Sequence, residues 1–443
     1  MLIVLSSLSD NDFSAMTKNK KNTRHQLLVI GMGVLFIVAI TIHFVTSKKP
    51  PTKPIQISYS VSDPAFRESI GHLLGPGLED GNRVKELVNG DQVFPSMLEA
   101  ARGAKKTITM EMYIWASGKL SDEFILAFSE RARAGVKVKC LVDGMGSIHL
   151  KKDDIVKMKA AGVQFVFYGR EKWWKFKPNL NHRTHRKIMV VDGAIGFMGG
   201  VCIEDKWLGN AESTEVWRDT HFRIEGPAVK QMQAIFAANW LQTTGEVIQG
   251  VGYFPESKPL GNSLLQCFKS GPLEGNENAR LLYLFSIAAA GKTIRLSHGY
   301  FVPDDLTITA LLAARKRGVE IEVIVPEKND SAIGRAASRS RWGKLLVAGV
   351  KFYAFQPALY HCKEMIVDDL WVTAGSMNFD NRSFHLNDEA NFNVLDKNFA
   401  AAQIKVFEED KSKSKPCTLA DFNRRPWYNQ CGDYCAGFLR STL

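Results

Sequence analysis

The chain has few cysteines, and they follow no regular spacing. Seven occur among 443 residues: Cys140, Cys202, Cys267, Cys362, Cys417, Cys431 and Cys435. An odd and irregular set argues against a disulfide framework and against a structural zinc site, because both need cysteines at defined spacings. Cys431 and Cys435 could lie one helical turn apart, but a metal would need more ligands than the sequence offers nearby. We therefore expect no metal and no cofactor.

Charged residues are absent from one long apolar stretch, residues 27–45. At ~1.5 Å per residue a helix of this length spans about 28 Å, close to the hydrocarbon core of a bilayer. We favour an uncleaved transmembrane anchor over a cleaved signal peptide, because the run is long for a signal sequence and no small-residue cleavage site follows at once. Basic residues flank both sides almost equally, so they do not predict which side of the membrane holds the rest of the chain.

Acidic residues are outnumbered by basic ones, 46 to 57, which gives a formal net charge of +11. Such a balance favours anionic partners, namely phospholipid headgroups, nucleic acid or other phosphates, although a solvated basic surface would give the same excess. The chain is long enough for two similar domains. A basic tail, residues 1–26, precedes the apolar stretch, and residues 46–79 are expected to form a linker that begins with the extended segment KKPPTK.

One short pattern occurs twice, 176 positions apart. Each copy has a histidine, a lysine two residues later, an aspartate five residues after that, and a small-residue turn seven residues further on. The copies are His185, Lys187, Asp192 and Gly199-Gly200, then His361, Lys363, Asp368 and Gly375-Ser376, with Asn378 completing the second. A single such pattern would be weak, but two copies at matched spacing indicate one active site built from two similar halves.

The surrounding sequence repeats as well. Residues 106–113 are typical of a strand, residues 122–134 of a helix, and residues 136–142 of a second strand; residues 292–297, 311–317 and 319–325 repeat this order. Glycine follows each helix, as expected at the end of a helix that leads into a strand. The sequence therefore predicts two α/β domains, residues 80–258 and 259–410, each a mostly parallel sheet flanked by helices, followed by a basic tail, residues 411–443.

The repeated residues suit chemistry at a phosphodiester. Side chains two positions apart on a strand point to the same face, so each histidine and lysine can reach one phosphate. Lysine offsets the phosphate charge. One imidazole can form a covalent phosphohistidine, and a second can protonate the leaving oxygen and later deprotonate the acceptor. Ser376 and Asn378 can donate hydrogen bonds to phosphate oxygens.

Three other histidines, His182, His221 and His298, lie near these elements and could line the pocket. The remaining histidines are interpreted as ordinary surface or core residues.

From about residue 83 onward the chain resembles the phospholipase D superfamily, and within it bacterial cardiolipin synthases. The resemblance rests on five segments, namely residues 181–193 (NHRTHRKIMVVDG), 217–221 (WRDTH), 300–304 (YFVPD), 375–383 (GSMNFDNRS) and 387–391 (NDEAN). It implies two domains related by a pseudo-twofold axis, with both motifs at their interface. It also implies a covalent intermediate on one histidine, which we predict to be His185, with His361 as acid and base.

The resemblance also implies that an acidic residue downstream of each motif orients the histidine, and by position these acids are Asp219 and Glu389. Asp192 and Asp368 are expected to support the strand and turn. Cys202 departs from the family pattern, which usually has asparagine there, and cysteine is a poor hydrogen-bond donor. Cys362 is expected on the face opposite His361.

These features predict a membrane-anchored phosphatidyltransferase that joins two phosphatidylglycerol molecules into cardiolipin and glycerol. The alternatives are a phospholipase D that uses water as acceptor, a nuclease of the same superfamily, and a scaffold without activity. No aromatic platform or basic recognition helix for nucleic acid stands out in the sequence. The expected partners are therefore phosphatidylglycerol and the cell membrane. The basic, aromatic carboxyl-terminal tail suits either a membrane contact or a helix packed on the body.

Overall fold

A computed structural model describes residues 31, 33, 53–169, 182–272 and 277–438. The chain divides into two compact units, residues 1–52 and residues 53–443, and the second unit holds both motifs. The amino-terminal tail and the predicted membrane span, apart from Gly31 and Gly33, lie outside the described residues. Among the residues that are described, no helix is both long and apolar enough to cross a membrane.

Among the described residues the sheet has sixteen strands, fifteen along one path and one, β5, that pairs with β17 beside it. The two halves of the path meet at the pair β1–β10. From this seam the first half runs β1 (Glu79–Val88), β9 (Thr220–Glu225), β7 (Ile195–Gly199), β6 (Ile188–Val191), β2 (Thr107–Met112), β3 (Lys137–Asp143) and β4 (Gln164–Tyr168). The second half runs β10 (Ser263–Ser270), β17 (Asn387–Leu395), β16 (Trp371–Gly375), β15 (Lys363–Val367), β11 (Thr293–His298), β12 (Glu320–Pro326), β13 (Lys351–Phe355) and β18 (Ser414–Cys417). Apart from β18, which has no counterpart among the described strands of the first half, the two halves therefore use their strands in the same order.

The prediction of mostly parallel sheets is wrong. Within the two halves only β2–β3–β4 and β11–β12–β13 are parallel, and the other neighbours along the path from β18 to β4 are antiparallel. Parallel neighbours need a crossover through a helix, whereas each motif strand turns straight back into the next strand. The turns lie at residues 192–194 and 368–370, between β6 and β7 and between β15 and β16. The sheet is therefore mixed.

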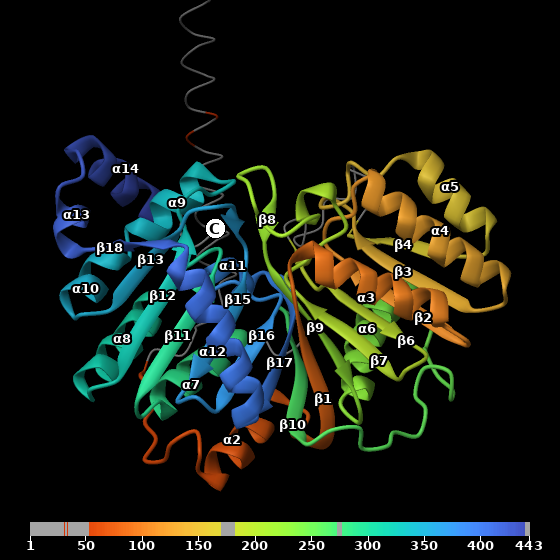
Figure 1. Ribbon diagram of the computed structural model, residues 1–443, viewed down its shortest axis with the longest axis horizontal. Coiled ribbons are helices and arrows are strands. Elements are labelled where there is room, and N and C mark those ends of the chain that lie inside the picture. Colours follow the sequence, from red (N-terminus) through yellow and green to blue (C-terminus); the bar gives the residue numbers. More distant parts are fainter. Residues whose placement is uncertain (1–30, 32, 34–52, 170–181, 273–276, 439–443) are drawn as a thin grey trace, which may run out of the picture. The chain divides into compact units, whose positions relative to one another are not determined.

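Helices cover both faces of each half (Figure 1). In the first half α3 (Asn89–Gly103) and α4 (Lys119–Arg133) share a core with Met189 and Val191, while Ile188 and Val190 face α6 (Val229–Thr244). In the second half α7 (Asn278–Ala289) and α8 (Asp305–Lys316) cover one face and α12 (Lys397–Ser412) covers the other. The remaining helices are α2 (Pro64–Leu74), α5 (Lys152–Ala160), α9 (Ala332–Arg339), α10 (Trp342–Val347), α11 (Asn381–His385), α13 (Leu419–Asn423) and α14 (Trp427–Phe438).

The two motif aspartates make matching hydrogen bonds at these turns. Asp192 adopts a positive φ of 52°, and its carboxylate accepts from the backbone N–H groups of residues 105, 106 and 107 at 2.7–2.8 Å. Asp368 has the same φ and accepts from residues 291, 292 and 293 at 2.7–2.9 Å. Each carboxylate thus ties its turn to the loop that starts β2 or β11.

Replacing Asp192 by alanine should therefore destabilise the fold. Three backbone donors would lose a charged acceptor, and alanine is disfavoured at positive φ, so the free energy of unfolding should fall by about 2 kcal/mol or more. Denaturant unfolding of Asp192→Ala measures this, with Glu99→Ala, which removes an exposed carboxylate on α3, as the matched control. Equal stability of the two variants would contradict the role of Asp192 at the turn.

Candidate active site

Two very short strand pairs, one on each side of the site, join the halves. β5 (Arg183–Thr184) pairs in parallel with the start of β17, so that Thr184 lies opposite Asp388. In the same way β14 (Leu359–Tyr360) pairs with β8 (Trp217–Arg218). The residue after each pair is a motif histidine on one strand and an acidic residue on the other. Each histidine therefore lies beside a carboxylate from the opposite half.

His185 pairs with Glu389. Its Nδ1 lies 2.9 Å from Glu389 Oε1 and 3.0 Å from Oε2, and both side chains are buried. The hydroxyl of Ser376 donates to Oε2 at 2.5 Å, and that of Ser383 donates to Oε1 at 2.8 Å. Burial acts to raise the pKa of Glu389, but the nearby His185 and Lys187 outweigh it and lower that pKa. Glu389 is thus held as a carboxylate facing His185.

His361 pairs with Asp219. Its Nδ1 lies 2.6 Å from Asp219 Oδ2, which also accepts from the indole N–H of Trp207 at 3.2 Å. Burial acts to raise the pKa of Asp219, yet the adjacent His361 and Lys363 lower it overall. The second pair therefore matches the first, with a shorter acid.

The two lysines are buried beside the histidines. Lys187 Nζ donates to the carbonyl of His185 at 2.6 Å and lies 5.1 Å from the ring centre of Tyr113. Lys363 Nζ donates to the carbonyl of His361 at 2.5 Å. Burial lowers the pKa of Lys187 to about 8, while nearby Cys202 and Glu389 act in the opposite direction.

The histidines are neutral in this environment. Burial is the main cause that lowers the pKa of each to about 4. The charge of Lys363 lowers the pKa of His185 further, and the charge of Lys187 does the same for His361. Each lysine thus acts on the histidine of the opposite motif, which places both motifs in one electrostatic environment.

The residues of the two small-residue turns are not equivalent. The hydroxyl of Ser376 donates a hydrogen bond to Glu389 and so orients this acid. The sequence had suggested that this hydroxyl donates to a phosphate. Asn378 is buried, and its Oδ1 has no hydrogen-bond partner among the described residues. Cys202, which takes the corresponding place in the first half, is buried close enough to Lys187 to influence its pKa.

Sequence reasoning left several neighbouring side chains without a role. The ring of Tyr113 lies 4.9 Å from that of His185, and Trp217 lies 4.9 Å from His361, each measured between ring centres. Arg218 forms a buried two-point ion pair with Asp410, through Nε at 2.9 Å and Nη2 at 2.8 Å. No linear spacing could reveal this pair, because the two residues are far apart in the chain.

The other three histidines differ from one another. His221 and His298 are fully buried, and neither ring nitrogen has a hydrogen-bond partner in the described part of the chain. Burial lowers the pKa of both, and His298 lies opposite Lys363 in the sheet. His182 is only partly buried. His298 is thus a neutral group beside the motif strand β15, and His221 is a neutral group opposite Gly199 of β7.

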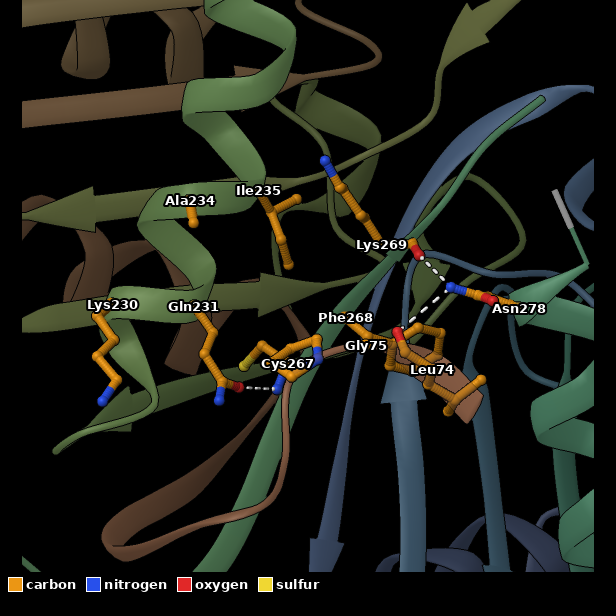
Figure 2. A pocket seen from close by; sticks show the side chains of 11 residues that line it. Leu74, Gly75, Lys230, Gln231, Ala234, Ile235, Cys267, Phe268, Lys269 and Asn278 are labelled. Carbon is orange, nitrogen blue, oxygen red and sulfur yellow. Dashed lines mark hydrogen bonds between the residues drawn. The ribbon is translucent and has the colours of Figure 1, made fainter. Parts of the chain in front are cut away.

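A cavity of about 500 Å³ lies elsewhere, between α6, the end of α2 and β10 (Figure 2). Leu74, Ile235 and Phe268 line it, and none of the motif histidines, motif lysines or their acids does. Arg186 links it to the site by donating to the carbonyls of both Ile235 and Glu389 at 3.2 Å. The candidate site therefore lies next to the pairs β5–β17 and β14–β8 and not in this cavity.

Comparison with known proteins agrees with this geometry. The family described as the phospholipase D-like domain of cardiolipin synthase matches residues 97–240 and 283–411, which include both motifs. The chain belongs to this family. A probable cardiolipin synthase of Bacillus subtilis is 37% identical over 345 residues, which cover 78% of this chain and 69% of the relative. Cardiolipin synthase 2 of Bacillus anthracis is 34% identical over 77% of this chain and 67% of that protein.

A solved structure shares the fold. Phosphatidylserine synthase of Haemophilus influenzae superposes with a TM-score of 0.62 at 14% identity, over 86% of this chain and 99% of that one. At this identity the likeness concerns the fold alone. The family membership, together with the relatives, identifies a cardiolipin synthase-like phosphatidyltransferase of the phospholipase D superfamily.

The crossed pairing predicts how substitutions of the acids will act. Asp219→Asn should shift the Nδ1–H signal of His361, which is distant in sequence, and leave that of His185 unchanged. Glu389→Gln should shift the Nδ1–H signal of His185 and leave that of His361 unchanged. Proton NMR of the imidazole N–H groups measures this, with Asp421→Asn on the exposed α13 as control. A shift of the histidine of the same half in either variant would contradict the arrangement.

Proposed function

We propose that this protein joins two phosphatidylglycerol molecules into cardiolipin and glycerol through a phosphohistidine. The observation that carries the proposal is the pair of buried imidazoles, each with Nδ1 facing a carboxylate from the other half. A carboxylate at Nδ1 fixes the tautomer that leaves the Nε2 lone pair available, and it stabilises the imidazolium that forms later.

The first step forms the covalent intermediate. Nε2 of His185 attacks the phosphorus of one phosphatidylglycerol, and the bond from phosphorus to the glycerol oxygen breaks. His361 gives its proton to that oxygen, so glycerol leaves as an alcohol. In the free protein burial keeps His361 neutral, but an anionic phosphate beside it favours the protonated form and supplies the acid that this step needs.

The second step releases the product. His361, now neutral, takes the proton from a headgroup hydroxyl of the second phosphatidylglycerol, and that oxygen attacks phosphorus while the bond to His185 breaks. Lys187 and Lys363 offset the charge that develops on the phosphate oxygens. Asn378 can donate a hydrogen bond to phosphate, whereas Cys202 is a weak donor at the matching position, so the phosphate is held unequally by the two halves.

The proposal extends to the architecture. The matching strand order on either side of the seam supports two domains, residues 80–258 and 259–410, related by a pseudo-twofold axis. Residues 27–45 are proposed as a single membrane anchor in the cell membrane, on the basis of their apolar sequence.

A lipid product assay tests the reaction. Purified protein supplied with phosphatidylglycerol should give cardiolipin and free glycerol in equal amounts. His185→Asn and His361→Asn should each lower this rate by about a hundredfold or more, since each removes a nucleophile or an acid and base. His72→Asn, an exposed histidine on α2, is the control. Phosphatidic acid as the sole product would instead assign the hydrolase, and full activity of either site variant would contradict the shared site.

The pKa values predict the pH range of activity. The first step needs His185 neutral and His361 protonated, and because burial lowers the pKa of each to about 4 in the free protein, kcat/KM should be greatest near pH 4 and fall as the pH rises. Lys187 must be charged, and because its pKa is lowered to about 8, this fall in kcat/KM should become steeper as the pH rises through 8. A pH profile of kcat/KM measures both effects. In Lys187→Arg, which stays charged, the fall in any remaining activity should no longer become steeper near pH 8.

A further inference from the structure

The last helix, α14, is fastened to the body by one face only. Asp433, Ala436 and Gly437 are buried, and Ala436 packs in a small apolar cluster with Val302 and Ala337 next to α9. A Cβ atom on Gly437 would lie 3.1 Å from Ser340 Oγ, so the two helices approach closely at this point. Asp433 also pairs with Arg425, which precedes the helix. These contacts fix which face of α14 points outward.

The outward face is aromatic and exposed. It carries Trp427, Tyr428, Cys431, Tyr434 and Cys435, which at 3.6 residues per turn fall within an arc of about 120°. Trp427 is 75% exposed, Tyr428 60% and Tyr434 69%, and both cysteines are exposed. Large aromatic side chains on one face of a helix are expected to be covered by a partner.

The segment around this face is basic. Residues 411–438 hold five lysines and arginines against two aspartates. Lys413, Lys415 and Arg424 are exposed, and Arg424 keeps 78% of its side chain accessible although it contacts Asp421. Tryptophan and tyrosine rings settle at the level of lipid headgroups, and lysine and arginine are attracted to anionic lipids.

We propose that the Trp427–Cys435 face of α14 docks on the surface of an anionic phospholipid bilayer. A second copy of the chain is a poorer occupant, because a symmetric contact would bring the same basic residues against each other. A bilayer that contains phosphatidylglycerol would instead offset their charge. The contact would form whether the acceptor of the reaction is a lipid or water, and it would hold the catalytic unit at the surface where a lipid substrate lies.

The exposed cysteines allow a local test on the full chain. Cys417→Ser together with Cys431→Ser leaves Cys435 as the accessible cysteine of the described residues for labelling with bimane. The protein is placed in vesicles of equimolar phosphatidylglycerol and phosphatidylcholine that carry a spin-labelled phospholipid. The expected result is loss of bimane emission to the lipid-borne quencher and protection from iodide in the water. The control is a label on Val156→Cys, 63% exposed on α5, in a chain without Cys417, Cys431 and Cys435, and it should show the reverse.

Two results would overturn the proposal. One is full quenching of the Cys435 label by iodide with none by the lipid quencher. The other is protection from iodide that appears without lipid and increases with protein concentration, which would assign the face to a second copy. Neither quenching readout depends on cardiolipin synthesis. A failure of the proposed reaction can therefore be distinguished from a failure of the proposed membrane contact.

A triple variant links the contact to activity. Trp427→Ser, Tyr428→Ser and Tyr434→Ser together should lower activity on vesicle-borne lipid by about tenfold or more, because the variant lacks the rings that bind the bilayer surface. Activity on detergent-dispersed lipid should stay unchanged, which also shows that the variant is folded. An equal loss in both assays, or none in either, would contradict the membrane contact.

Discussion

The hydrogen bond from each motif histidine to a carboxylate of the other half is the interaction on which the site depends. His185 with Glu389 and His361 with Asp219 are both fully formed, at 2.9 and 2.6 Å. These hydrogen bonds form because β5 pairs with β17 and β14 pairs with β8. In each case a parallel pairing of two residues places the following histidine beside its acid. Neither half can orient its own histidine, and the seam must therefore form before the site is complete.

The two halves share one arrangement of histidine and carboxylate, but different residues surround the carboxylate in each. A Cβ at Gly200 would lie 2.3 Å from Asp219 Oδ1, so the first half has no room for a side chain there. At the corresponding place in the second half Ser376 donates to the longer Glu389. Trp207, at the end of a short 3-10 helix of the first half (Asp205–Trp207), supplies a donor to Asp219 instead. The two histidines thus meet equivalent charges through unequal contacts, which fits different roles for them in one reaction.

Burial sets the protonation states of the site. It keeps both imidazoles neutral and brings the pKa of Lys187 down to about 8, while the carboxylates keep their charge because histidine and lysine lie beside them. A bound phosphate would change this balance, since its negative charge favours the protonated forms of the histidines and lysines. The site is therefore arranged to gain protons as it gains an anionic substrate.

Much of this could be predicted from the sequence. Two copies of His-x-Lys on strands, each followed by an aspartate and a small-residue turn, indicated a phosphodiester site made of two halves, and the α/β class followed from the alternation of strands and helices. The parallel sheet was predicted wrongly, because strand direction depends on whether a chain turns back or crosses over. Asp192-Gly193, both at positive φ, is a hairpin signal in the local sequence that the prediction did not use.

Residue types and their local spacing determined the chemistry, the repeat and the apolar and basic segments of this protein. Only the tertiary structure decided that each acid serves the opposite histidine, that Ser376 supports Glu389, and that Arg218 pairs with Asp410. It also decided which face of α14 is exposed. The physical reason is that these contacts join residues far apart in the chain, and their geometry comes from packing between elements rather than from any local pattern.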